Sequence, residues 1–184
     1  CEFSYTRQKE MKGLGHAILT GETLIGDEAF AVVLADDLCI TDGDGVLSQM
    51  LELFKQFGCS IVAVEEVSDD KIHQYGVVYG NRLNERVYRI TDMIEKPSRA
   101  DTSSNLGIIG RYILTQDIFD LLRETPLGRN GELQITDALK KQAEQGRVIA
   151  YRFAGRRFDC GSIDGFVDAT NHCYKKFHKQ EKKI

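Results

Sequence analysis

Short apolar runs rich in β-branched residues alternate along the chain with stretches in which apolar residues recur every three or four positions. The first pattern is typical of buried strands, and the second of helices that turn one face to a core. Residues 31–34 form an entirely apolar run, as expected of a strand covered on both faces. Residues 46–57 carry a single apolar stripe that ends at Gly58, and residues 60–64 form the next strand. Residues 31–64 are therefore predicted to form a right-handed βαβ unit.

The same alternation continues to the end of the chain, without repeats or linkers. Residues 75–79 and 87–94 are predicted to be antiparallel strands on either side of a turn at Gly80-Asn81. Further strands are predicted at residues 1–5, 108–114, 148–153 and 157–159, and further helices from Ala17, from a Thr115 cap to before Pro126, at 136–145 with Gly146 as cap, and at 163–177. Strands that alternate with helices indicate an α/β fold, predicted here as one domain over residues 1–184.

Composition narrows the function classes. The chain has 184 residues, 42% of them apolar and 28% charged, with a net charge of −4. These values fit a folded domain and argue against disorder, and the scattered basic residues argue against a nucleic-acid groove. A basic tail is read as a solvated helix end, with an interaction role as the alternative; its members are Lys175, Lys176, Lys179, Lys182 and Lys183.

The cysteines and the ends of the chain suggest a cytoplasmic setting. Five cysteines occur at irregular spacing without a C-x-x-C pair, which favours reduced thiols over zinc or a disulfide framework. No apolar run reaches the roughly 20 residues that a membrane-spanning helix needs, and no signal peptide is recognisable. The chain begins at Cys1, without a methionine, in what reads as a strand already under way. A truncated or partly ordered chain is therefore expected.

Two glycines bracket Leu14 just before a predicted helix. Because glycine has no Cβ, Gly13 and Gly15 allow the backbone to approach a flat or anionic ligand, and the helix N-terminus favours an anion. The pattern is neither G-x-G-x-x-G nor a P-loop. A tight turn into the helix is the structural alternative.

Two neighbouring aspartates, Asp36 and Asp37, follow the apolar run 31–34. Ligands of open α/β sheets lie beyond the carboxyl ends of the strands, where a carboxylate can bind a hard cation and a phosphate oxygen together. Adjacent residues point in different directions, so one aspartate is the candidate metal ligand and the other supports it or faces solvent. A loop or cap carboxylate is the alternative.

Two further strand ends carry polar chemistry. Glu95 can accept hydrogen bonds from sugar hydroxyls, and Lys96 offers a compact cation for phosphate. Pro97 is expected to hold Lys96 in an extended conformation. Asp159 ends the strand before the last helix. An exposed ion pair at 95–96 and a turn at Asp159 are the alternatives.

Taken in order, these segments resemble the bacterial UTP–glucose-1-phosphate uridylyltransferases, over about residues 3–177. The resemblance rests on Arg7-Gln8, on residues 12–17 (KGLGHA), 34–37 (LADD), 75–77 (YGV), 95–97 (EKP), 104–107 (SNLG), 110–112 (GRY), 134–138 (QITDA) and 159–161 (DCG). The resemblance implies an open twisted mixed sheet flanked by helices, of the Rossmann-like nucleotide-diphospho-sugar transferase type. It also implies formation of UDP-glucose and pyrophosphate from UTP and glucose 1-phosphate with Mg²⁺, in a homodimer or homotetramer.

Residue by residue, the resemblance assigns roles on the nucleotide and metal side. Gln8 and Gly13 would contact uracil. Asp36 would hold Mg²⁺ against the phosphates and is the first catalytic candidate. Lys96 would bind the phosphate and is the second. Asp159 matches a second metal ligand of related thymidylyltransferases.

On the sugar side, the resemblance implies that Gly76 lines the pocket with its backbone and that Glu95 binds glucose hydroxyls. Asn105 and Gly107 match the segment beside the sugar, with Gly107 where the family has alanine. The family also begins with a strand and a G-x-G-T-R loop that nothing in this chain matches. The chain is therefore expected to be the C-terminal two-thirds of the enzyme, to expose apolar surface, and to be unable on its own to bind UTP productively or to catalyse the reaction.

Two alternatives to this reading remain open. One is a relative that uses another sugar phosphate or another nucleoside triphosphate in the same site. The other is a regulatory paralogue that keeps the fold without catalysis, although the retained Asp36, Glu95, Lys96 and Asp159 argue against that reading.

Overall fold

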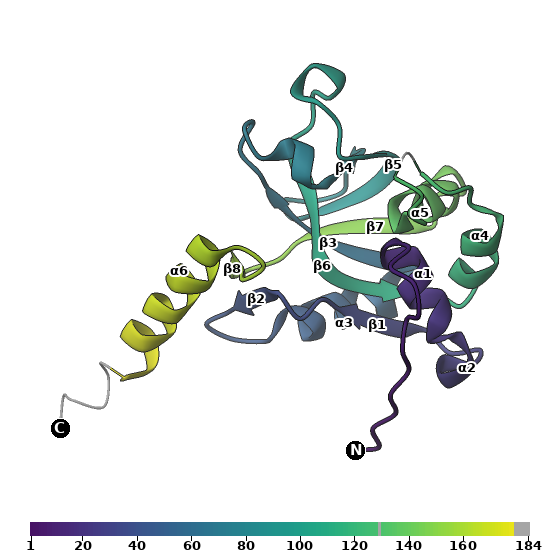
Figure 1. Cartoon of the computed structure of the whole chain (residues 1–184). Helices are drawn as coiled ribbons and strands as arrows, with labels where there is room; N and C mark the ends of the chain where they lie inside the picture. Colours follow the sequence, from purple (N-terminus) through teal and green to yellow (C-terminus); the bar gives the residue numbers. More distant parts are fainter. Residues whose placement is uncertain (129, 179–184) are drawn as a thin grey trace.

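The computed structural model describes residues 1–128 and 130–178, and it arranges two sheets among helices (Figure 1). The strands are β1 (Phe30–Val33), β2 (Asp37–Ile40), β3 (Ser60–Glu66), β4 (Gly76–Arg82), β5 (Val87–Glu95), β6 (Leu106–Leu114), β7 (Val148–Arg152) and β8 (Arg156–Asp159). The helices are α1 (Gly13–Thr20), α2 (Glu22–Ile25), α3 (Val46–Phe57), α4 (Ile118–Glu124), α5 (Ile135–Glu144) and α6 (Ile163–Cys173). Short 3-10 turns lie at Ile72–Gln74 and Arg99–Asp101, and a π-helical turn at Tyr174–His178 continues α6.

The large sheet has six strands in the order β1-β6-β3-β7-β5-β4. β3 and β7 run parallel, whereas the other neighbours pair antiparallel. Strand β6 also meets β4 where Gly107 pairs with Val77. The predicted mixed sheet is confirmed.

Helices cover the large sheet on both faces, and the alternation along β3 shows how. Val62 and Val64 point into a core built with α1, α4 and α5. Ile61 and Ala63 point the other way, into a core built with α3. Because both faces are covered, the central strand is apolar at every one of these positions.

Helix α3 agrees with its sequence pattern. It covers residues 46–57 as predicted, and Val46 and Met50 carry its buried face. Gly58 follows with φ 60°, a left-handed conformation that satisfies the last turn through its N–H to Phe54 O. This conformation suits glycine because a Cβ clashes with the backbone there.

Replacing Gly58 by alanine is expected to lower the free energy of unfolding by about 1 kcal/mol, because alanine adopts a positive φ at a cost. Nothing lies within 4 Å of the added Cβ, so the backbone alone sets the effect. Urea denaturation measures it. Gly43→Ala is the matched control, since Gly43 is equally open and has no positive φ. Equal stability of the two variants would contradict this account.

Strand β1 is less buried than predicted. Its residues alternate between partly buried and exposed, and Val33 is 50% exposed. The reason is its place at the edge of the sheet, where only β6 pairs with it. Both β1 and β3 run antiparallel to β6, so they are parallel to one another with β6 between them. The strand–helix–strand order of the predicted βαβ unit is confirmed, and its handedness stays a prediction.

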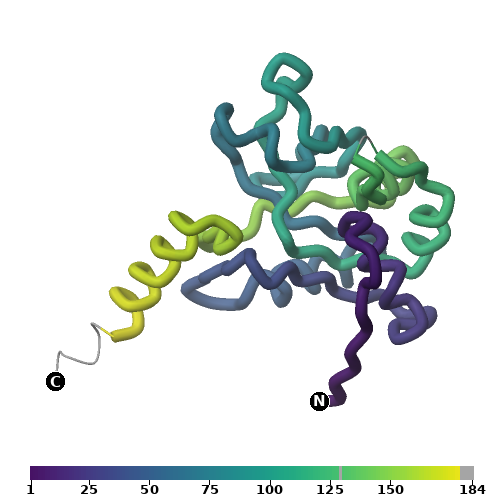
Figure 2. The backbone as a smooth tube through the Cα atoms, in the orientation of Figure 1, coloured from purple at the N-terminus to yellow at the C-terminus, as the bar shows by residue number. Residues whose placement is uncertain are grey.

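Three local predictions were wrong. Residues 1–5 form no strand; this segment extends away from the body, and Phe3 and Tyr5 are exposed (Figure 2). Gly80-Asn81 is not the turn but continues β4 through an irregularity in its pairing with β5. Asp117, rather than Thr115, precedes the first turn of α4.

A second, two-stranded sheet was not predicted. β2 pairs antiparallel with β8, which joins residues about 120 positions apart in the chain. Within the described ranges, no helix is both long and apolar enough to cross a membrane. Of the basic tail, Lys176 contacts Asp42 at 2.6 Å, whereas Lys179, Lys182 and Lys183 lie outside the described residues.

Candidate active site

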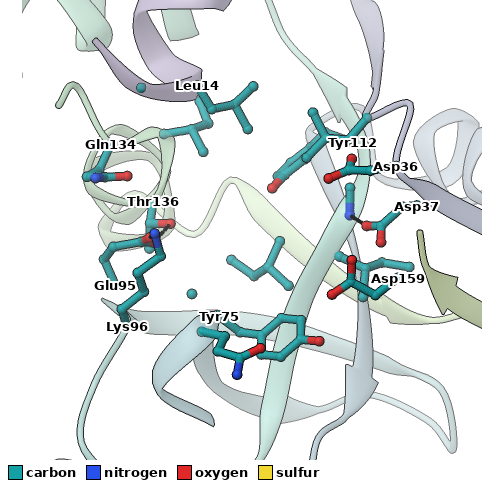
Figure 3. Close-up of a pocket in the computed structure, with 18 of the residues that line it drawn as sticks. Leu14, Asp36, Asp37, Tyr75, Glu95, Lys96, Tyr112, Gln134, Thr136 and Asp159 are labelled. Atoms are coloured by element: carbon teal, nitrogen blue, oxygen red, sulfur yellow. Dashed lines mark hydrogen bonds and ion pairs between the residues drawn. The ribbon is translucent and has the colours of Figure 1, made fainter. Parts of the chain in front are cut away.

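A polar cavity of about 410 Å³ lies between the two sheets and the start of α1 and α5 (Figure 3). Asp36, Asp159 and Tyr112 lie on one side of it, and Glu95, Lys96 and Thr136 lie on the other. The cavity therefore has an acidic side near β2 and β8, and a side with both charges at the end of β5.

The pairing of β2 with β8 brings the acidic side together. Asp37 pairs with Asp159 in the ladder, and the Cys160 N–H donates to Asp36 O at 2.7 Å. Gly161 leaves room between the carboxylates: a Cβ there would sit 3.2 Å from Asp36 Oδ2 and 3.1 Å from Asp159 Oδ1. Asp36 and Asp159 thus face a common space that glycine keeps open.

Asp37, in contrast to Asp36, has a structural role. It is buried, accepts the Gly110 N–H at 2.5 Å and accepts Arg157 Nε at 2.5 Å. As predicted for neighbouring residues, the two aspartates point in different directions. Asp36 is left exposed to the cavity, while Asp37 ties the small sheet to β6.

Arg157 binds several elements at once. Besides Asp37, its guanidinium donates to Glu65 Oε1 at 2.8 Å and to Tyr75 Oη at 2.9 Å. Burial disfavours its charge, but the hydrogen bond to Tyr75 and the charge of Asp37 outweigh burial and raise the pKa of Arg157. The side chain is 8% exposed, so the cation is fixed beneath the acidic side of the cavity.

On the opposite side, Thr136 Oγ1 donates to Glu95 Oε2 at 2.6 Å. Gly76 packs beside this pair, since a Cβ on it would sit 2.8 Å from Thr136 Oγ1 and 3.1 Å from Glu95 Oε2. Lys96 Nζ lies 3.9 Å from Glu95 Oε1 and is half exposed. Thr136 therefore holds one carboxylate oxygen of Glu95, and the other carboxylate oxygen lies on the side of Lys96.

Lys96 does not have the extended backbone expected before a proline. Its φ is 45°, and it is the one non-glycine residue with positive φ in the described ranges. The Lys96 N–H donates to Tyr75 O at 3.0 Å, which extends the end of the β4–β5 pair beyond Glu95. Such strain persists only where the surrounding contacts enforce it, and it often lies at functional sites.

The paired glycines lie within the first turn of α1 rather than before it. A Cβ on Gly13 would sit 2.9 Å from Glu132 Cβ, and a Cβ on Gly15 would sit 2.7 Å from Leu133 O. The two glycines therefore let the first turn of α1 pack closely against residues 132–133, as the tight-turn alternative implies. Gly13 also lines the cavity.

Six of the predicted site residues line the cavity: Gly13, Asp36, Gly76, Glu95, Lys96 and Asp159. Three others lie outside its lining. Gln8 donates to Gly13 O at 3.1 Å and contacts His16 Nδ1 at 2.9 Å, so it supports the start of α1. Asn105 accepts the Val67 N–H through its backbone, and Gly107 packs against Val67 and Tyr75. The roles predicted for these three stay predictions.

Sequence reasoning missed other residues of the cavity: Tyr75, Tyr112, Gln134, Thr136 and Arg157. Tyr112 is buried, and burial raises the pKa of its phenol. The segments 75–77, 110–112 and 134–138 were among those that carried the resemblance, but no chemistry was assigned to these side chains. Tyr75, Gln134 and Thr136 lie at the starts of β4 and α5, and that position was the available signal, whereas Tyr112 and Arg157 lie within strands.

The acidic side suits Mg²⁺. No group of three or more His, Cys, Asp or Glu side chains that could hold a metal gathers within residues 1–128 and 130–178. Mg²⁺ does not need such a group, because it usually takes one or two carboxylates and keeps water or substrate phosphates as its other ligands. Asp36 and Asp159, facing the space beside Gly161, fit that pattern.

Strand-end carboxylates opposite a lysine and a glutamate, in an α/β fold with a mixed sheet, define a domain suited to phosphorylated ligands. The comparisons with known proteins agree with this class. The chain belongs to the nucleotidyl transferase family, whose pattern matches residues 1–176.

Individual relatives are close. A UTP–glucose-1-phosphate uridylyltransferase of Pseudomonas aeruginosa is 58% identical over 99% of this chain and 66% of its own length. A UDP-glucose pyrophosphorylase solved with UDP-glucose shares 60% identity and a TM-score of 0.92, covering 96% of this chain and 67% of that one. A UTP-bound enzyme from Acinetobacter baumannii shares 34% identity and a TM-score of 0.80 over 93% of this chain and 59% of its own. The chain thus spans about two thirds or less of the lengths of these relatives.

Proposed function

We propose that the full-length protein joins UTP and α-D-glucose 1-phosphate to give UDP-glucose and pyrophosphate. The observation that carries the proposal is the opposition, across one cavity, of Asp36 and Asp159 to Glu95 and Lys96. The names of relatives up to 60% identical to the chain support the same choice of substrates.

In this reaction an oxygen of the sugar phosphate attacks the α-phosphorus of UTP. The bond to the β-phosphate breaks, and pyrophosphate leaves with the electron pair. The attacking phosphate is already anionic at neutral pH, so no general base is required. Catalysis then depends on aligning two anions that repel each other, and on neutralising their charge.

Residues of this chain supply that alignment. Lys96 offsets the charge of the sugar phosphate, and its enforced backbone conformation aims the side chain at the cavity. Asp36 and Asp159 would hold Mg²⁺, which supplies positive charge to the phosphate oxygens when bound. Arg157 ties β8, which ends at Asp159, to β2, which begins one residue after Asp36.

The remaining residues would recognise the two ends of UDP-glucose. Glu95 accepts hydrogen bonds from glucose hydroxyls, and Gly76 lets the sugar approach the backbone. Asn105 and Gly107 would lie beside the sugar. Gly13, held by Gln8, would approach the uracil.

Pyrophosphate release by the full-length protein tests the proposal, with glucose 1-phosphate and other hexose 1-phosphates against UTP, dTTP and CTP. UTP with glucose 1-phosphate should give the highest kcat/KM. A higher value for another pair would identify a relative of different specificity. No turnover, together with no UDP-glucose binding by isothermal titration with or without Mg²⁺, would identify a non-catalytic paralogue.

The setting of the enzyme is part of the same proposal. A cytoplasmic enzyme fits substrates that are themselves cytoplasmic metabolites and the five free cysteines of the chain. A homodimer or homotetramer is expected from the family.

Thr136→Val is expected to raise the KM for glucose 1-phosphate about 5- to 10-fold, because it removes the hydrogen bond that fixes Glu95 without changing side-chain volume much. Steady-state kinetics on the full-length protein, with UTP saturating, measures the change. Thr136→Ser keeps the hydroxyl and should restore a KM close to that of the wild type. An unchanged KM in the valine variant would show that Glu95 needs no such support.

A further inference from the structure

A second cavity, of about 650 Å³, shares no lining residue with the active-site cavity and carries several cationic side chains. Arg156 comes from β8, and His172, Lys175 and Lys176 come from the end of α6 and the turn that continues it. Among the residues that the structure describes, the only carboxylate in this lining is that of Asp42, in the loop after β2. Three full positive charges thus face one negative charge, in a chain whose net charge is −4. We call this space the cationic cavity.

The two-stranded sheet lies between the cationic cavity and the active-site cavity. Neighbouring residues of a strand point to opposite faces. Arg157 and Asp159 line the active-site cavity, whereas Arg156 lines the cationic cavity. Ile40, the cross-strand partner of Arg156, lines the cationic cavity as well. A ligand held by Arg156 therefore lies on the opposite face of β8 from the reaction proposed above.

Contacts within the protein hold the cations of this cavity in place. The Arg156 guanidinium lies over the ring of Phe158, 4.5 Å from its centroid, and the His172 ring packs on the same phenyl group at 5.1 Å. Lys176 Nζ lies 2.6 Å from Asp42 Oδ1, and the lysine side chain is only 26% exposed. These contacts join β8, α6 and the loop after β2, and Figure 1 shows α6 beside β8. Because the groups are already ordered, binding a ligand costs less conformational entropy.

Two of the cations have no ionic partner of their own. Within residues 1–128 and 130–178, no carboxylate pairs with Arg156 or with Lys175, since Asp42 engages Lys176. Cations at the end of a helix also offset its dipole, but Arg156 belongs to a strand and has no such role. A guanidinium can bind a phosphate through two parallel hydrogen bonds, and an ammonium adds a compact charge. The unpaired groups are therefore those that recognise a phosphate.

We propose that the cationic cavity binds the phosphate group of a small phosphorylated molecule. Arg156 and Lys175 neutralise the phosphate, and His172 and Lys176 add hydrogen-bond donors beside them. The volume of about 650 Å³ lies in the range of metabolite pockets, so the molecule can extend beyond its phosphate. Because this site and the active-site cavity are lined by different residues, the ligand is additional to the substrates of the proposed reaction.

Amide NMR titration of the chain tests the proposal, with ribose 5-phosphate and inorganic phosphate as probes and ribose as the unphosphorylated control. Signals of Arg156, His172 and Lys175 should shift with one Kd of about 1 mM or lower for at least one probe. Ribose should shift none of them. Tighter binding of ribose 5-phosphate supports a metabolite site, and equal binding supports a site for free phosphate. Shifts confined to the surroundings of Lys96, or none with either probe at about 10 mM, would overturn the proposal.

Charge substitutions assign the binding to these side chains. Lys175→Glu should raise the Kd of the tighter probe at least about 10-fold, because a repulsion replaces an attraction beside the phosphate. Arg156→Gln should weaken binding by a similar factor. Lys71→Glu is the matched control, since Lys71 is an exposed lysine outside the cavity, and Lys96→Ala should likewise leave this Kd unchanged. An unchanged Kd in either the Lys175 or the Arg156 variant would overturn the assignment.

Discussion

The Asp36→Asn variant of the full-length protein is expected to form UDP-glucose at least about 100-fold more slowly than the wild type at saturating substrates, the size of effect that follows loss of one key electrostatic group. The amide is nearly the same size as the carboxylate but carries no charge. Asp36 is exposed to the cavity, and within residues 1–128 and 130–178 its carboxylate has no hydrogen-bond or ion-pair partner, so its loss should change the chemistry and leave the fold intact.

Two measurements and a control variant test that expectation. Pyrophosphate release at increasing Mg²⁺ should show that added metal does not restore the variant. Calorimetric titration with Mg²⁺ and UDP-glucose should show weaker metal binding, which is a readout separate from turnover. Asp44→Asn is the matched control, because Asp44 is an exposed carboxylate of the loop after β2 that lies outside the cavity. Turnover within a few-fold of the wild type at saturating Mg²⁺ would remove Asp36 from the metal site.

Local signals were sufficient for much of the fold. Helix α3 combines an apolar stripe with a glycine whose left-handed conformation ends it, and both signals lie within 13 consecutive residues. The central strand β3 is apolar on both faces because helices cover both. These two elements were predicted correctly because their signals lie close together in sequence, whereas the turn expected at Gly80-Asn81 was wrong although it was also a local signal.

Long-range pairing explains most of what was missed. Strand β2 has only four residues, and it pairs with β8, which lies about 120 positions further along the chain. Strand β1 is apolar throughout, yet it lies at an edge, which a run of apolar residues does not reveal. The bond between Thr136 and Glu95 joins residues 41 positions apart, so no local spacing could indicate it.

The candidate site shows the same difference between local signals and long-range contacts. Reasoning from residue chemistry identified Asp36, Glu95 and Lys96 because charged groups at strand ends are conspicuous in a sequence. The backbone of Lys96 could not be predicted, since its hydrogen bond to Tyr75 overrides the preference imposed by the following proline. The structural role of Asp37 depends on its ion pair with Arg157, and no local pattern indicates a pair between residues 120 positions apart.

The second large effect is expected on stability, from loss of the ion pair between Arg157 and Asp37. Arg157→Leu is expected to lower the free energy of unfolding by about 3 to 5 kcal/mol, because it leaves the carboxylate of Asp37 buried without its cation. The loss also frees Glu65 and Tyr75, which join the large sheet to β8 through the same guanidinium. Urea denaturation followed by circular dichroism measures the change.

A surface arginine provides the comparison. Arg152 pairs with Glu66 but is 36% exposed, so Arg152→Leu should cost no more than about 1 kcal/mol. A variant with both Asp37 and Arg157 replaced by leucine should be more stable than the sum of the single losses predicts, since neither charge is then left alone. If Arg157→Leu were no more damaging than Arg152→Leu, the small sheet would be held by its ladder alone. Asp159 would then owe its position to β2, and the ion pair beneath the cavity would have no part in aligning the two carboxylates proposed to hold Mg²⁺.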